Sequence, residues 1–269
     1  MRLWIMLGVL ALLGACGGGD DGDNTGGQDL LAQETEGGDA QALTADLTGR
    51  IYRITLLEAT ATTKELNKVW AKAIDEYKLT LLFMVQEHDP VAGTITAAFT
   101  TGVSEATEAD GVYTLVKMMP ALEPVTFTAK LTGARFDIQG EVSFDIHDPT
   151  VNKPFHVEGI TGFGIFSADG TAIEDCQLSG GIRETQAEGM CATLLTLGVV
   201  NFHWFMNLVH ICPDWDLDSD QTMDAYYFQG HLEAEERTPF YDETITPIVP
   251  NDNVKVCQPH TEECIPKVD

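Results

Sequence analysis

Basic residues are scarce in this chain. Its 269 residues include 15 Lys and Arg against 42 Asp and Glu, which leaves a formal net charge of −27 at pH 7. Binding of nucleic acid or of anionic lipid surfaces by bulk electrostatics requires clustered positive charge. The composition therefore argues against both, whereas cations and basic proteins are compatible partners.

Familiar catalytic motifs are missing as well. The sequence has no Gly-x-Ser-x-Gly, no His-Glu-x-x-His, no Walker loop and no Cys-x-x-Cys. The first three motifs mark nucleophilic, zinc and phosphate chemistry, and the last marks redox or zinc-ribbon sites. We therefore expect that the protein is not an enzyme.

One repeated tripeptide leaves an enzymatic alternative open. His88-Asp89-Pro90 and His147-Asp148-Pro149 each follow a predicted strand. Two His and two Asp side chains on neighbouring loops could bind a transition metal, as in a metal-dependent hydrolase. The simpler interpretation is that Asp-Pro initiates a turn in both places.

The N-terminus has the features of an export signal. Arg2 precedes an apolar run over residues 3–13, and the run ends in Leu13-Gly14-Ala15-Cys16. This segment resembles the lipobox of bacterial lipoproteins. The resemblance covers 16 residues, and it implies cleavage before Cys16, acylation of Cys16 and a lipid-anchored place in the cell envelope. Gly17 replaces the Asp that signals inner-membrane retention in such proteins, which points to the outer membrane.

Composition divides the chain into four segments. Residues 1–15 are the predicted signal peptide, and residues 16–46 are rich in Gly, Asp, Gln and Thr, which predicts a flexible tether. Residues 47–240 have enough apolar positions for a folded domain, and residues 241–269 contain several Pro and predict an extended tail.

Short apolar runs separated by turn residues predict a mainly β domain. Val69, Trp70 and Ala73 follow Thr63 at helical spacing and predict one amphipathic helix. No further helix interrupts the runs up to residue 178, so we expect an antiparallel sandwich or barrel. The predicted strands are 47–60, 79–87, 94–101, 111–118, 125–132, 134–144, 155–166, 171–178 and 225–234.

Residues 185–211 are apolar nearly all round, which predicts a buried helical insertion. In one straight helix, Cys191 and Cys212 would lie too far apart to bond. We therefore expect a break near Gly198, a helical hairpin and a Cys191–Cys212 bridge. An alternative function follows from the same segment: a β domain that captures a small apolar ligand in a cavity lined by residues 202–206.

Six cysteines are present, and five remain if Cys16 carries lipid. An odd number leaves one free or paired between chains. We expect a second bridge, Cys257–Cys264, that closes a small loop in the tail, and we assign no role to Cys176. Bridges of this kind fit an oxidising compartment outside the cytosol.

The most informative stretch is the Asp-rich loop of residues 214–224. It matches the side-chain spacing of calcium loops of the Asp-x-Asp-x-Asp type. Two positions depart from that pattern, because Gln221 replaces the usual turn Gly and Tyr227 replaces the final Glu. The predicted ligands are the side chains of Asp216, Asp218, Asp220 and Asp224 and the backbone carbonyl of Thr222.

Asp214 could supply a further ligand, and the alternative to a metal site is a solvated acidic turn. Taken together, the sequence predicts a lipid-anchored envelope protein with a structural or binding role, stabilised by Ca²⁺. A protein or a small apolar molecule is its expected partner.

Overall fold

The structure is a computed structural model that describes residues 42–59, 64–147, 154–194, 198–237, 241–247, 257–258 and 260–261, with the backbone alone for 64–66, 192–194 and 198. The chain divides into two units, Met1–Gly38 and Asp39–Asp269, and every described residue belongs to the second. Acylation of Cys16 and the pairing of Cys264 therefore concern positions outside the described residues.

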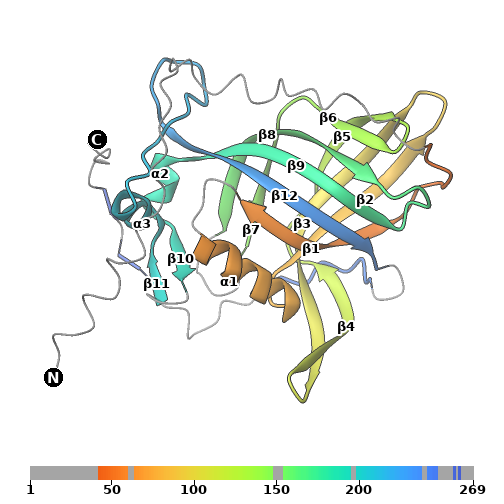
Figure 1. Cartoon of the computed structure of the whole chain (residues 1–269), viewed down its shortest axis with the longest axis horizontal. Coiled ribbons are helices and arrows are strands. Elements are labelled where there is room, and N and C mark those ends of the chain that lie inside the picture. The colour runs from red at the N-terminus through yellow and green to blue at the C-terminus, as the bar shows by residue number, and fades with distance from the viewer. Residues whose placement is uncertain are drawn as a thin grey trace, which may run out of the picture. The chain divides into compact units, whose positions relative to one another are not determined.

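Eight strands form a closed antiparallel barrel, and two further strands extend its wall (Figure 1). Each barrel strand pairs with the barrel strands before and after it in the chain, and β1 closes the wall by pairing with β12. This confirms the predicted antiparallel β fold and selects the barrel. The barrel strands are β1 (Ile51–Ala59), β2 (Thr80–Asp89), β3 (Thr94–Ala109), β5 (Val125–Thr132), β6 (Arg135–Gln139), β8 (Phe155–Phe166), β9 (Ala172–Arg183) and β12 (Ala225–Glu236).

The two additional strands each lengthen one part of the wall. The first half of β3 pairs with β2 and β5, whereas its second half pairs with β4 (Val112–Pro120). The resulting β3–β4 ribbon leaves the barrel and projects from it (Figure 1). The other strand, β7 (Val142–Ile146), pairs with the first half of β8.

The two ends of the barrel are built differently. At the turn end, residues 90–93, 133–134 and 167–171 connect neighbouring strands. At the loop end, the connections are long and carry α1 (Lys64–Asp75), the β3–β4 ribbon, β7 and the whole of residues 184–224 (Figure 1). Candidate functional residues therefore gather at the loop end.

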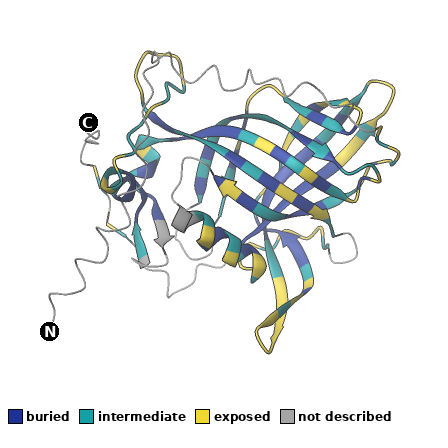
Figure 2. Cartoon of the chain, viewed as in Figure 1, coloured by how far each residue is buried: buried dark blue, intermediate teal, exposed yellow. Residues whose placement is uncertain are grey.

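Aromatic side chains fill the interior. They alternate with outward-facing residues along the strands, because successive side chains of a strand point to opposite faces. The inward-facing side chains pack against one another and are buried (Figure 2). Their ring centroids lie 4.1 to 6.3 Å apart. A barrel of eight strands is just wide enough for such side chains to fill it. The rings belong to Tyr52, Phe83, Phe99, Phe127, Phe136, Phe144 and Phe166.

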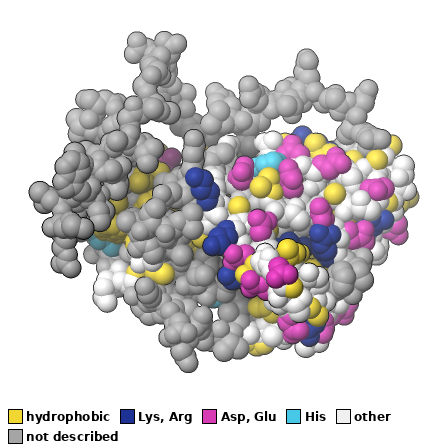
Figure 3. Space-filling model, turned by 60° about the horizontal axis from the view of Figure 1, so that its bottom comes forward, with side chains coloured by type: hydrophobic (Ala, Val, Ile, Leu, Met, Phe, Trp, Pro, Cys, Tyr) yellow, Lys and Arg dark blue, Asp and Glu magenta, His cyan; other side chains and the backbone are white. Residues whose placement is uncertain are grey.

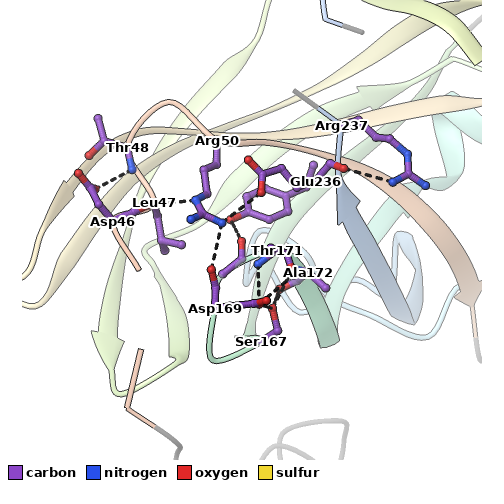
Figure 4. Close-up of polar contacts among 12 residues, drawn as sticks. Asp46, Leu47, Thr48, Arg50, Ser167, Asp169, Thr171, Ala172, Glu236 and Arg237 are labelled. Carbon is purple, nitrogen blue, oxygen red and sulfur yellow. Dashed lines mark hydrogen bonds and ion pairs between the residues drawn. The ribbon is translucent and has the colours of Figure 1, made fainter. Parts of the chain in front are cut away.

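The segment before β1 covers the turn end. Leu47 is fully buried, and its Cδ2 lies only 2.8 Å from where a Cβ on Gly170 would sit. Arg50 donates to the Asp169 carbonyl and pairs with Glu236, each at 3.1 Å, so the segment is tied to the β8–β9 turn and to β12 (Figure 4). Leu47 thereby belongs to the same core cluster as the aromatic side chains of the barrel.

The predicted helical hairpin is wrong. Residues 184–208 form α2 (Glu184–Ala187), a β hairpin of β10 (Cys191–Leu194) and β11 (Gly198–Asn201), and α3 (Phe202–Leu208). The expected break does fall near Gly198, but Thr and Val around it favour strands over helix. Asn201 then caps α3 by accepting the Trp204 N–H at 2.9 Å. Among the described helices, none has the length and apolar character needed to cross a bilayer.

The predicted cysteine pairs are also wrong in their partners. Cys191 is bonded to Cys257, with Cα atoms 5.8 Å apart, and therefore does not form the predicted bridge with Cys212. Because Cys257 is used in this way, it cannot close the small loop with Cys264. Cys212 is disulfide-bonded too, as predicted for that residue. Cys176 is a free thiol inside the barrel, where burial raises its pKa to about 12.

Candidate metal site at the Asp-rich loop

Three of the predicted ligands lie together. One carboxylate oxygen each from Asp216, Asp218 and Asp220 falls within 4.8 Å of the others. The alternate spacing predicted this arrangement, because residues i, i+2 and i+4 of a tight loop can converge on one point. Hard oxygen ligands at such separations suit Ca²⁺, which binds oxygens at about 2.3–2.6 Å.

Asp216 organises the turn of the loop. Its two carboxylate oxygens accept the backbone N–H groups of Asp220 at 3.0 Å and Gln221 at 2.8 Å. Asp220 in turn accepts the N–H of Thr222 at 2.8 Å. The loop is therefore already turned around the first ligand position.

Two residues of the loop have left-handed backbone conformations. Ser219 has φ of 62° and Gln221 has φ of 73°. Asp-rich calcium loops usually have Gly at the position of Gln221. The backbone of Gln221 adopts the left-handed conformation that Gly normally provides there. A side chain in this region costs about 1 kcal/mol or more.

The fourth predicted carboxylate, Asp224, is not part of the cluster. Its Oδ2 accepts a hydrogen bond from Arg183 Nη1 at 2.7 Å, and its Oδ1 accepts from the Leu217 N–H at 3.4 Å. Asp214 is also committed elsewhere, since it accepts the N–H of Tyr227 at 3.1 Å. The side-chain cluster is thus smaller than the sequence predicted.

Arg183, at the end of β9, is the residue that sequence reasoning missed. Its guanidinium also contacts Asp218 at 3.1 Å and Glu158 on β8 at 3.2 Å. Hydrogen bonds to these carboxylates raise the pKa of Arg183 further above its ordinary value. A cation therefore already balances part of the acidic charge, and it fixes the loop to two barrel strands.

Trp215 fixes the same loop by packing. A Cβ on Gly181 would come within 2.5 Å of the Trp215 ring, and one on Gly159 within 2.9 Å. Trp215 also exchanges backbone hydrogen bonds of 3.1 Å with Ala225, at the start of β12. These glycines let the ring lie against the barrel wall, so the residue just before the first ligand is held in place.

A polar cleft of about 410 Å³ opens beside the loop. Asp218 and Ser219 line it from the loop side, and Arg183, Glu141 and Glu158 line it from the barrel side. Of the three clustered carboxylates, Asp218 lines this cleft, so the cleft gives water and ions access to one side of the cluster.

Within the described part of the chain, the lumen has small apolar cavities of about 50, 30 and 20 Å³, and the 30 Å³ cavity shares lining residues with each of the other two. The 50 Å³ cavity lies at the loop end, and Trp70, Phe202 and Met206 line it. This matches the region predicted to line a cavity. In its wall, buried Tyr226 bonds through its hydroxyl to His203 Nδ1 at 2.7 Å, and burial raises the pKa of Tyr226.

The histidines of the two His-Asp-Pro tripeptides lie far apart, and Asp148 and Pro149 fall outside the part of the chain that the structure describes. His88 lies opposite Ile95 on β3, whereas the backbone N–H of His147 donates to Thr101, six residues further along the same strand. Six residues of strand span about 20 Å. Zinc ligands must all lie near 2 Å from the ion, so a hydrolase centre built from both histidines is wrong.

No protein-family model, no curated protein and no solved structure matches this chain. The fold and the loop geometry must therefore carry the functional argument.

Proposed function

We propose that this protein is a lipid-anchored β-barrel of the cell envelope that binds Ca²⁺ at the Asp-rich loop and has a structural or binding role there. The observation that carries the proposal is the convergence of Asp216, Asp218 and Asp220 within 4.8 Å on a loop already turned around Asp216. Waters and a backbone carbonyl, such as that of Thr222, would complete the six to eight oxygens that Ca²⁺ takes.

Ca²⁺ would stabilise the fold by linkage and by neutralising neighbouring carboxylates. A loop that lacks the bidentate Glu is expected to bind like an extracellular module, with Kd of roughly 10⁻⁴ to 10⁻³ M. At 10 mM Ca²⁺ such a site adds about 1.4 to 2.7 kcal/mol to the free energy of unfolding. For a chain of this size, that is a rise in Tm of about 3 to 10 °C.

Thermal melts with EGTA and with 10 mM Ca²⁺ test this part of the proposal. The wild-type melt should shift, and the Asp216→Ala/Asp218→Ala double variant should melt at one temperature in both buffers. Asp110→Ala, at the exposed turn between β3 and β4, is the matched control and should shift like the wild type. If the wild type melts at the same temperature in EGTA and in 10 mM Ca²⁺, the proposed Ca²⁺ site is wrong.

The lipid anchor is supported by Leu13-Gly14-Ala15-Cys16 and by the Gly- and Asp-rich residues that follow. Metabolic labelling with a palmitate analogue should tag the wild-type chain and leave Cys16→Ser unlabelled. Fractionation of cells should place the wild-type chain in the outer membrane. Equal labelling of both chains would contradict the anchor.

A second candidate function is capture of a slender apolar ligand in the lumen. The three adjoining cavities, which end at Phe202 and Met206, favour it. A volume of 50 Å³ holds only a few carbon atoms, so α3 must move outward to admit more. Palmitate should then quench Trp70 fluorescence at one ligand per chain, and Met206→Trp should block binding. Unchanged fluorescence would reject this candidate.

A further inference from the structure

The β3–β4 ribbon is an unusual element for a barrel of this kind. Beyond Val103 and Met119 its strands leave the wall, and residues 105–112 are all exposed (Figure 2). The ribbon ends in the two-residue turn Asp110-Gly111, with φ of 54° and 79°. A two-stranded ribbon that stands alone is marginally stable in water, so a protruding one gains from a third strand.

The edge of β4 is covered along only part of its length. Near the barrel, residues of the C-terminal segment cover it: Asp242 N–H donates to the Met118 carbonyl at 3.0 Å, and Thr246 N–H to that of Pro120 at 2.9 Å. Among the described residues, none pairs with the outer edge, residues 112–117. Unpaired strand edges are templates for another chain.

The chemistry of this outer edge sets it apart from the rest of the protein. Residues 112–117 contain no acidic side chain and one basic one, Lys117, in a chain of net charge −27. Val112 and Val116 are 65% and 47% exposed. Figure 3 shows how widely acidic side chains spread over the face on which the ribbon comes forward.

We propose that the outer edge of β4 is a dimerisation site, at which two copies of this chain pair β4 with β4 in antiparallel fashion around a two-fold axis at Thr114. In this register Val112 of each copy lies opposite Val116 of the other, and Tyr113 lies opposite Leu115. β-Branched and aromatic–aliphatic pairs of this kind stabilise a sheet. The contact is isologous, as in most soluble dimers.

Charge favours a second copy as the occupant. Lys117 pairs with Glu105 of its own ribbon at 3.4 Å, and the same register also brings it opposite Gly111 of the other copy, next to its Asp110, so each basic residue of the edge meets an acidic turn. The axis at Thr114 lies five residues beyond Met119, which is about 17 Å of strand from the wall of each barrel. That exceeds the Debye length of about 8 Å at physiological ionic strength, so the two acidic barrels are screened from each other.

Cysteine cross-linking of the full-length chain tests the register. Thr114→Cys places two thiols at the axis, where facing Cα atoms of antiparallel strands lie about 4.5–5.5 Å apart, within disulfide range. Thr107→Cys is the matched control, because Thr107 is equally exposed and pairs with Thr114 across the ribbon. Its copies would lie about 15 Å apart, which is too far.

We expect a disulfide-linked dimer of Thr114→Cys under mild oxidation and a monomer of Thr107→Cys. Adding Val112→Lys to Thr114→Cys should abolish the cross-link without changing Tm, since Val112 is solvent-exposed in the monomer. Cross-linking should increase between 20 and 200 mM salt, because screening reduces repulsion between the barrels.

Three results would overturn the proposal. No dimer of Thr114→Cys means that the edge does not self-pair. Equal cross-linking of Thr107→Cys means that collisions, and not a defined register, bring the thiols together. A Thr114→Cys adduct with a protein of different mass means that another partner occupies the edge.

Discussion

The Arg183 guanidinium lies 3.1 Å from Asp218, so an internal cation already neutralises one of the three clustered carboxylates. Ca²⁺ must compete with this contact and must also approach a fixed positive charge. Replacing Arg183 should therefore strengthen Ca²⁺ binding, although it removes a contact that holds the loop to β8 and β9.

Arg183→Gln is expected to bind Ca²⁺ about 2- to 5-fold more tightly, because a partly exposed ion pair is worth about 0.2–1 kcal/mol. Its stability without Ca²⁺ should fall, since Glu158 and Asp224 lose their partner. Calorimetric titration measures the affinity. Arg135→Gln is the control, because Arg135 forms a similar pair with Asp137 on β6 and should not alter Ca²⁺ affinity. Weaker binding by Arg183→Gln would contradict competition.

Gln221→Gly should relieve the left-handed strain in the loop. The φ of 73° suits Gly, so the variant is expected to gain up to about 1 kcal/mol of stability and to bind Ca²⁺ more tightly. Thr222→Gly, one residue further on, should lose stability. The glycine increases the conformational entropy of the unfolded chain and relieves no strain in the folded protein. Urea unfolding separates these two outcomes. A loss of stability in both variants would show that position 221 is not strained.

Gly181→Ala tests whether Trp215 fixes the loop. The added Cβ would meet the ring at 2.5 Å, and the expected cost is about 1–3 kcal/mol. Gly230→Ala on β12 is the matched control, because its Cβ would have no neighbour closer than 3.8 Å. Urea unfolding gives the stability, and Trp emission reports movement of the ring. Equal stability of the two variants would mean that the ring has room to move.

Acid should weaken the turn end through Asp169. Its carboxylate accepts hydrogen bonds from Thr171 and from Ser167, which lower its pKa from 3.8 to about 2 (Figure 4). Because the folded pKa is depressed, this contribution is present above about pH 4 and is lost as the pH falls toward 2.

Asp169→Asn should therefore be less stable than the wild type at pH 7, and its stability should change less between pH 5 and pH 2. Asp110→Asn, at the tip of the ribbon, should follow the wild-type curve. Urea unfolding at a series of pH values gives the comparison. Parallel curves for wild type and Asp169→Asn would show that this carboxylate does not contribute.

Much of the local structure could be predicted from the sequence. The helix carrying Trp70 and most barrel strands follow from apolar periodicity, and the Asp cluster follows from alternate spacing along one loop. These features depend on residues close together in the chain. For such residues, the spacing of side chains along the sequence is enough to place them on one face of a helix, strand or loop.

Features that depend on distant residues could not be predicted in the same way. Cys191 and Cys257 are 66 positions apart, and Arg183 reaches Asp218 across 35 positions. Arg183 reaches the loop because β9 and β12 pair at Arg183 and Ala225, where the Asp-rich loop returns to the barrel. Closure of the barrel depends on the tilt and register of all eight strands together, so it cannot be predicted from any single segment of the sequence.

The most direct test of the account is a calorimetric titration of the protein with Ca²⁺, repeated on Asp216→Asn/Asp218→Asn. The account predicts one bound Ca²⁺ per wild-type chain with Kd of roughly 10⁻⁴ to 10⁻³ M, and no binding by the double variant. Wild-type heats equal to dilution, or an unchanged Kd in the variant, would contradict a Ca²⁺ site at the Asp-rich loop.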